Sequence, residues 1–409
     1  MTDNKPIRIA VDAPPGPLKS PRNYGAVQLA SLGALPPRAP SSPPLPNVNI
    51  EGGCDINIED EGHTYTLSPK SNNICKNNNI TGQDYLNGLI HLASHDFIVR
   101  HLIMSKAKLG LAQDGSAIIS FQERVSAFEG LLSAPTWIPF RNGKWPGARQ
   151  ICEIAPNRWE AICPSNSIPS ILIEVVRNPE ENVTLYEKGI INQTADTATP
   201  FYSTPAAGGL RIVKKTSLRG IIVFSGELVG DNKKPLRKEI NNILTNTNCG
   251  EHVGWAKAIT PSDDPEPLKN LTTLDWSTTA SKNGLILAFS DYYPNATIAW
   301  SIATTLHKNG ISCTPVSDSY SNPKIKAAMR LMIVSGPTDD AWGRYASLIL
   351  CPVWRNQSQA HKLYISTLKS SLFNSAHRQL LDDLLSDSCP SVTIGAIPSI
   401  CLSNVNLKN

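Results

Sequence analysis

The stretch of this 409-residue chain that most limits its possible folds is a strand–helix–strand pattern over residues 284–317, followed by another apolar strand from residue 329. The run GLILAFS leads into a helix-length segment, which Asn309 and Gly310 end before ISCTPV begins. Two strands joined by a helix normally lie parallel in one sheet, because a helical crossover is the usual connection between parallel neighbours. The pattern therefore predicts a mixed α/β fold, with its clearest βαβ unit in residues 284–340.

Short strands and helices alternate along the rest of the chain. An alternating run at 6–13 predicts an opening strand, and a hairpin is predicted at 54–69. Thr81 is placed to cap a helix over 82–95. Further strands are expected at 115–121, in three short pieces between 149 and 179, at 218–227 and at 392–398, and further helices at 24–35, at 183–191, from Pro235 and near 359–388. Proline makes up 32 residues, about 8% against a usual value of about 5%, which favours turns and extended segments over a helical bundle.

Charge and hydropathy narrow the classes of partner. Lysine and arginine exceed aspartate and glutamate by only four, spread thinly, so we expect no nucleic-acid partner. No apolar run approaches the length of about 18 residues that crosses a bilayer. No secretory leader is visible at the start, and nine cysteines without a CxxC pair fit a reducing compartment. A cytoplasmic location is therefore slightly favoured if Met1 is the native start; a removed leader would make the protein periplasmic or extracellular.

Common catalytic and cofactor motifs are missing from the sequence: GxSxG, GxxxxGK[ST], GxGxxG and HExxH do not occur. His91 and His95 stand four residues apart on a predicted helix, but no third ligand lies at a matching offset, so we interpret the pair as structural and expect no metal and no cofactor. Cys313 and Cys351 are conceivable nucleophiles, although buried thiols more often act as small apolar side chains. No acid–base constellation is convincing, which leaves catalysis uncertain and disfavoured.

Six residues are candidates for contact with a ligand. Asp339 and Asp340 follow an apolar strand, and carboxylates at the carboxyl end of a strand are well placed to meet a ligand. The alternative is that they occupy the first turn of a helix capped by Thr338. Aromatic side chains line most ligand clefts but also fill cores. The aromatic candidates are Tyr24, Tyr292, Tyr293 and Trp342.

Eight short segments, taken in order, resemble the bacterial extracellular solute-binding proteins of family 5, which are the oligopeptide-, dipeptide- and nickel-binding components of ABC importers. The segments are IRIAVDAPP, NYGAVQLASLGALPP, EDEGHTYTL, ITGQDYLNGL, VVRNP, YEKGIIN, LRKEINNIL and LHKNGISCTPV. The tryptophan–glycine segment that the family has after its hairpin is replaced here by SPKSNNICKNNN, and the chain is short for the family. The resemblance identifies a divergent member without a visible leader.

The resemblance implies a two-lobed fold of the periplasmic-binding-protein type, in its three-domain peptide-binding form, with a hinge and a cleft between the lobes. Lobe I would be residues 1–46, 148–222 and 392–409, an accessory subdomain would be 47–147, and lobe II would be 223–391. In peptide-binding members an aspartate of the second lobe holds the α-amine of the ligand, a role that would fall to Asp339 or Asp340.

The function implied is binding of a peptide or peptide-like solute, as a monomer that delivers it to an ABC permease. The alternative is a solute-binding fold kept in the cytoplasm and used as an enzyme or sensor in a specialised biosynthetic pathway. Since a fold does not fix a function, both stay open at this point.

Overall fold

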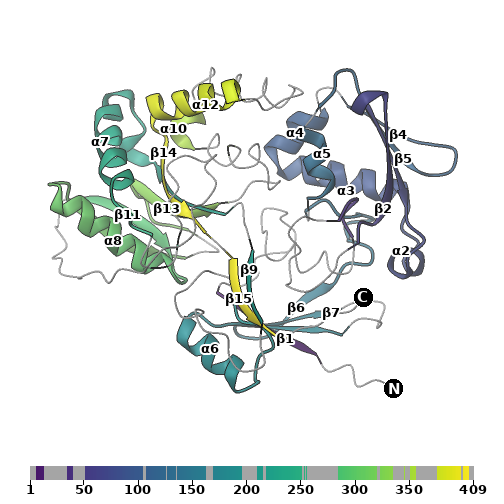
Figure 1. Ribbon diagram of the computed structural model, residues 1–409, viewed down its shortest axis with the longest axis horizontal. Helices are drawn as coiled ribbons and strands as arrows, with labels where there is room; N and C mark the ends of the chain where they lie inside the picture. Colours follow the sequence, from purple (N-terminus) through teal and green to yellow (C-terminus); the bar gives the residue numbers. More distant parts are fainter. Residues whose placement is uncertain are drawn as a thin grey trace.

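A computed structural model describes residues 6–12, 35–39, 51–104, 107–125, 127–134, 136–162, 169–195, 210–214, 218–250, 253, 255, 284–319, 323–334, 345, 351–355, 375–397 and 399–404. Figure 1 shows three groups of elements. One group contains α7, α8 and strands β10–β14, a second contains β2–β5 with α3–α5, and a third contains β1, β6–β9, β15 and α6. No helix in these ranges is both long and apolar enough to cross a membrane.

The predicted βαβ unit forms the centre of a five-stranded mixed sheet with the order β12-β11-β13-β10-β14. β11 (Leu285–Ser290) is parallel to both β12 (Cys313–Asp318) and β13 (Met329–Val334), and α8 (Asn295–Lys308) makes the crossover. β10 (Arg219–Phe224) runs antiparallel between β13 and β14 (Ser391–Ala396). α7 (Lys234–Thr245) packs beside α8 and β14. The mixed α/β prediction is thereby confirmed.

A second sheet is built around the opening strand. β1 (Ile7–Val11) is parallel to β8 (Ile171–Val175), and β7 (Arg158–Ile162) and β6 (Gln150–Ala155) extend the sheet by antiparallel pairing. A separate antiparallel pair, β9 (Leu210–Lys214) with β15 (Ser399–Ser403), joins it through Gln193, which bridges to Ile9 on one side and Ser403 on the other. α6 (Pro179–Glu187) follows β8 and packs with Ala10 and Leu402.

The second group, β2–β5 with α3–α5, is an antiparallel sheet covered by helices. Its order is β2-β3-β5-β4, with β2 (Cys54–Glu59), β3 (Thr64–Pro69), β4 (Ala107–Leu111) and β5 (Ala117–Phe121). The other elements are a 3₁₀ turn η1 (Asp60–Gly62), α2 (Asn73–Asn77), α3 (Gly82–His95), α4 (Phe97–Met104) and α5 (Ala127–Leu132). Buried aromatic rings fill its core: Phe128 makes edge contacts with Tyr65 and Phe121, at centroid distances of 4.8 and 4.9 Å. The remaining elements are η3 (Gly226–Leu228), η4 (Asp231–Lys233), α10 (Pro352–Arg355) and α12 (Ser375–Ser388).

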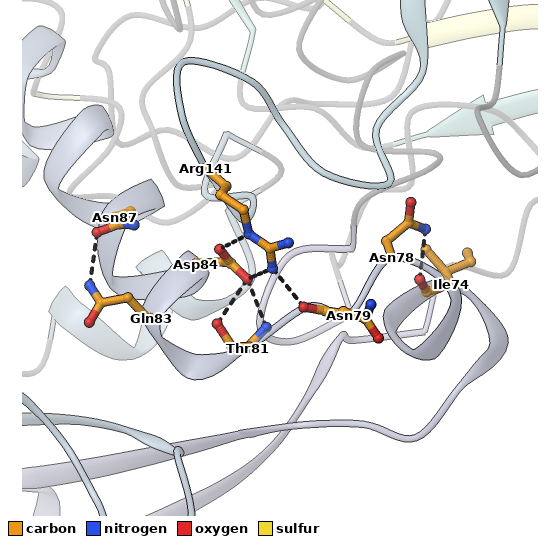
Figure 2. A network of polar contacts seen from close by, with 8 residues as sticks. All are labelled: Ile74, Asn78, Asn79, Thr81, Gln83, Asp84, Asn87 and Arg141. Carbon is orange, nitrogen blue, oxygen red and sulfur yellow. Dashed lines mark hydrogen bonds and ion pairs between the residues drawn. The ribbon is translucent and has the colours of Figure 1, made fainter.

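A buried carboxylate fixes the start of α3 and the loop that crosses it (Figure 2). Asp84 accepts from the backbone N–H of Thr81 at 2.8 Å and from its hydroxyl at 2.9 Å. Arg141 donates to both carboxylate oxygens of Asp84, through Nε at 2.7 Å and through Nη2, and also donates to the carbonyl of Asn79 at 2.6 Å. Burial opposes ionisation of Asp84, but the bonds from Arg141 and Thr81 outweigh burial and lower its pKa.

Two strands lie at or beside the expected lobe boundaries. β10 ends two residues beyond position 222 and β14 begins at 391, and both pair in the sheet that holds β11, β12 and β13. β9 and β15, which come directly before β10 and directly after β14, pair with each other beside β1. The division into lobe I, accessory subdomain and lobe II stays a prediction.

Candidate functional site

The carboxyl ends of parallel strands from two sheets face each other across the junction of the first and third groups of elements, which contain β11 and the β1–β8 pair. Asp12 directly follows β1, Arg177 lies two residues after β8, and Asp291 directly follows β11. Loops at the carboxyl ends of parallel strands are where open α/β sheets place their ligands. The arrangement brings charged side chains from distant parts of the chain to one place.

An ion pair connects the two sheets at this junction. Arg177 Nη1 donates to Asp291 Oδ2 at 3.2 Å and also lies 3.4 Å from the carbonyl oxygen of Asp291. The two side chains keep 54% and 37% of their accessible surface, so water competes for both charges. A contact of this kind holds the lobes together weakly and can exchange partners with a charged solute.

Tyr293 occupies the turn between β11 and α8. Its phenol has a pKa raised to about 12, first by burial and then by the negative charge of Asp12. The hydroxyl therefore stays protonated at neutral pH and can donate a hydrogen bond. Asp12 belongs to the other sheet, so Tyr293, like Asp291, contributes to the electrostatics of both sides of the junction.

The first turn of α8 adds a buried amide to the junction. The peptide bond between Tyr293 and Pro294 is cis, and the N–H of Asn295 donates to the Tyr292 carbonyl at 3.1 Å. Asn295 is 1% exposed, and its Oδ1 has no hydrogen-bond partner among the described residues. A buried amide oxygen without a partner is unusual, and the sequence alone does not reveal the burial of Asn295.

The structure places two of the six predicted ligand contacts at this junction. Tyr292 and Tyr293 are half-buried in the turn after β11. Tyr24, Asp339, Asp340 and Trp342 lie outside the described residues. The role of all six in ligand binding stays a prediction.

The two cysteines considered as nucleophiles have the properties of core residues. Cys313 and Cys351 are both buried, and burial raises the pKa of each thiol to about 12. Cys313 also begins β12, at the end of the sheet opposite Asp291. A thiol in that condition supplies almost no thiolate at neutral pH, so neither residue is suited to nucleophilic attack. Over the described ranges, no three His, Cys, Asp or Glu side chains gather closely enough to form a metal site.

Sequence reasoning assigned no role to Asp12, Arg177, Asp291 or Asn295. One local signal was present: Asp12, Arg177 and Asp291 each follow an apolar strand within two residues. That position at a strand end is the same criterion that selected Asp339 and Asp340. The pairing of Arg177 with Asp291 depends on how two separate sheets pack, which no local pattern shows.

The fold is shared with a group of solved solute-binding proteins. The chain matches NikA from Staphylococcus aureus in complex with Ni(L-His)2 with a TM-score of 0.73 at 13% identity, covering 99% of this chain and 96% of that one. It matches the dipeptide-binding protein from Pseudoalteromonas sp. SM9913 in complex with Met-Leu with a TM-score of 0.74 at 11% identity, covering 99% and 97%. AppA from Bacillus subtilis, in complex with a nonapeptide, gives 0.70 at 11% identity, covering 98% and 95%.

Sequence comparison finds no such relatives. No protein-family model matches the chain. No curated protein matches it either. The likeness to solved structures therefore establishes the fold alone: the chain has the periplasmic-binding-protein-like fold of the peptide-binding type along its whole length, as the resemblance of its eight segments implied.

Proposed function

We propose that the chain binds a peptide or peptide-like solute between its two lobes, as the solute-binding component of an ABC-type importer. The observation that carries this proposal is the junction at which Asp12 and Arg177 of one sheet meet Asp291 and Tyr293 of the other. Solved proteins of the same fold bind Met-Leu, a nonapeptide and Ni(L-His)2, which supports a small solute rich in amide, amine and carboxylate groups.

The connection between the sheets suits a movement of one lobe against the other. The chain passes from β9 to β10 and returns from β14 to β15, with β9 paired to β15 and β10 paired to β14. Ribbons of two strands bend more easily than they stretch, and domain closure is commonly absorbed by a few residues at the ends of elements. Such a movement would be absorbed at the ends of these four strands.

The junction offers groups that match both ends of a peptide. The carboxylates of Asp12 and Asp291 accept hydrogen bonds from an ammonium group, and the guanidinium of Arg177 donates to a carboxylate. A ligand that displaces one partner of the Arg177–Asp291 pair gains a charge-assisted bond of about 1.5–3 kcal/mol while the lobes close over it. Asp339 or Asp340 is proposed to hold the α-amine, and Tyr24, Tyr292, Tyr293 and Trp342 are proposed to provide apolar walls.

Native mass spectrometry of gently purified protein tests the proposal first. A small molecule or peptide that is present in the native mass and lost on denaturation supports the binding function and identifies the class of solute. A protein that is empty and binds no member of a peptide library, by calorimetry, overturns it. That result would favour the alternative of an enzyme or sensor built on the same fold.

Variants then locate the site. We expect Asp291→Asn to weaken the binding of the identified peptide at least tenfold. Asp387→Asn should leave it unchanged, because Asp387 is also an exposed carboxylate in an ion pair but lies on α12 beside Lys234. Equal affinity in wild type and Asp291→Asn would remove Asp291 from the site. Unchanged affinity in Asp339→Asn and Asp340→Asn would remove those two residues in the same way.

A further inference from the structure

Two imidazole rings lie side by side on the outer face of α3. The ring centroids of His91 and His95 are 4.7 Å apart, with the planes inclined at 57°. A metal ion about 2.1 Å from an imidazole nitrogen lies about 3.2 Å from that ring's centre, so two rings that share the ion have centres about 4.5 Å apart at a right angle and about 5.2 Å apart at a tetrahedral angle. The observed separation falls between these two values.

The tautomer of His95 is fixed by a backbone bond. Its Nδ1 lies 3.0 Å from the carbonyl oxygen of His91 and 2.7 Å from the hydroxyl of Ser94. A carbonyl oxygen can only accept, so Nδ1 carries the hydrogen and the lone pair of the ring is on Nε2. Metal-binding histidines typically have this arrangement, in which the second nitrogen donates to a carbonyl that orients the ring.

The ring of His91 is held by aromatic neighbours. It stacks on Phe140 with a centroid distance of 4.1 Å and an angle of 10°, and Trp145 approaches at 6.4 Å. Phe140 is held in turn, since its N–H donates to the Asp84 carbonyl at 2.9 Å and the next residue, Arg141, pairs with the Asp84 carboxylate (Figure 2). Rings that are already oriented lose little entropy when they bind an ion.

We propose that His91 and His95 form a two-imidazole site for a late divalent transition-metal ion, such as Ni²⁺, Cu²⁺ or Zn²⁺, on the accessory subdomain. Imidazole nitrogen prefers these ions to Mg²⁺ and Ca²⁺, which take oxygen ligands. Two histidines at i and i+4 on one helix face are the usual helical spacing for such an ion. Water completes the coordination, because the described residues supply no cluster of three ligands here.

A neighbouring charge changes the affinity of the pair for a cation. Arg100 donates to the carbonyls of Ala93 and Ser94 at 3.1 and 2.7 Å and so places a positive charge close to the pair. That charge repels a bound cation, and Arg100→Ala is therefore expected to bind the metal more tightly than wild type.

Calorimetric titration of the full chain with NiCl₂ at pH 7.5 tests the proposal. We expect one Ni²⁺ per chain in wild type, and at least a tenfold loss of affinity in both His91→Gln and His95→Gln. His307→Gln is the matched control, because His307 is an exposed histidine on another helix, α8, and its removal should change nothing. Absence of Ni²⁺ binding in wild type, or unchanged binding in the two glutamine variants, overturns the site.

Two more measurements separate this site from other binding. Cys152 is an exposed thiol, and loss of Ni²⁺ binding in Cys152→Ser but not in the histidine variants would assign the ion to that thiol instead. Cu²⁺ quenches a nearby indole, so the quenched fraction of fluorescence should fall in Trp145→Phe; an unchanged fraction would place the ion elsewhere. Asp291→Asn should keep the metal, which makes this outcome independent of the proposed solute site.

Discussion

Arg177 and Asp291 are 114 residues apart in the chain and 3.2 Å apart in space, and their ion pair is a direct link between the two sheets. Both side chains remain well exposed. Water and solutes can therefore reach this ion pair. Its contribution to stability can be measured by denaturation, separately from its effect on ligand binding.

Replacing either partner of this pair should cost little stability. We expect Arg177→Ala and Asp291→Ala each to lower the free energy of unfolding by about 0.2–1 kcal/mol, because exposed ion pairs are screened by water and salt. The double variant should lose less than the sum of the single losses, as measured by urea denaturation. A loss above about 2 kcal/mol for one variant would show that the pair has a structural role that this exposure does not explain.

Asp84→Asn should destabilise the accessory subdomain in a pH-dependent way. The carboxylate is buried and Arg141 is partly exposed, so we expect a loss of about 1–3 kcal/mol at pH 7. The pKa of Asp84 is lowered below its ordinary value of 3.8, so its stabilisation is complete above that pH and is lost as the pH falls through the folded-state pKa. Wild type and variant should converge as the pH falls through the folded-state pKa of Asp84. A difference that stays constant with pH would contradict this origin; Asp55→Asn, an exposed carboxylate on β2, is the control.

Arg237 should be the most costly arginine to replace. Its side chain is fully buried and donates to the carbonyls of Leu228, Gly230, Ser388 and Cys389, at 2.7 to 3.1 Å. Arg237→Lys keeps the charge but cannot reach both segments with one ammonium group, so we expect a loss of at least about 3 kcal/mol in urea denaturation. Lys238→Ala, at the next position of α7, should cost less than about 0.5 kcal/mol. Near-native stability of Arg237→Lys would show that these carbonyls are satisfied in another way.

Thiol labelling should distinguish Cys152 from the buried cysteines. Cys152 is exposed on β6, whereas Cys54, Cys313 and Cys351 are buried and have raised pKa values. Native protein treated with a disulfide reagent at pH 8 should release one equivalent quickly, and Cys152→Ser should remove that phase. Cys163 lies outside the described residues, so both measurements belong in a Cys163→Ser background. Rapid labelling of several sites in that background would mean that the buried thiols open readily.

Local signals predict elements better than they predict the site. The helix expected over 82–95 has those bounds in the structure, because Thr81 and Asp84 fix its start through contacts three residues apart. The strand expected at 218–227 is β10, but its antiparallel partners lie more than 100 residues away and no local pattern specifies them. β4 and α4 are not predicted, although both have local signals: Asp96 precedes α4 and accepts from the Val99 N–H at 3.1 Å, and the turn after β4 contains Asp114 and Gly115.

The candidate site shows the same contrast between local signals and long-range contacts. Tyr292 and Tyr293 can be selected from the sequence because they are aromatic residues directly after an apolar strand, which is a purely local criterion. Arg177 belongs to the candidate site because it pairs with Asp291, and the pKa of Tyr293 depends on Asp12. Both relationships join residues of two different sheets. Physical arguments about one segment at a time cannot supply such pairs, because the pairs arise only when two sheets from distant parts of the chain pack together.

The two strands near the end of the chain also fix an order of assembly during synthesis. β14 pairs with β10 and β15 pairs with β9, so the five-stranded sheet and the two-stranded β9–β15 sheet each take one strand from residues 391–403. Neither sheet can be complete while those residues are still inside the ribosome, whereas β2–β5 and α3 form a contiguous segment that can fold early. A nascent chain that stalls shortly before residue 391 would therefore carry one finished unit and two open sheet edges, the state in which chaperones and aggregation compete for it.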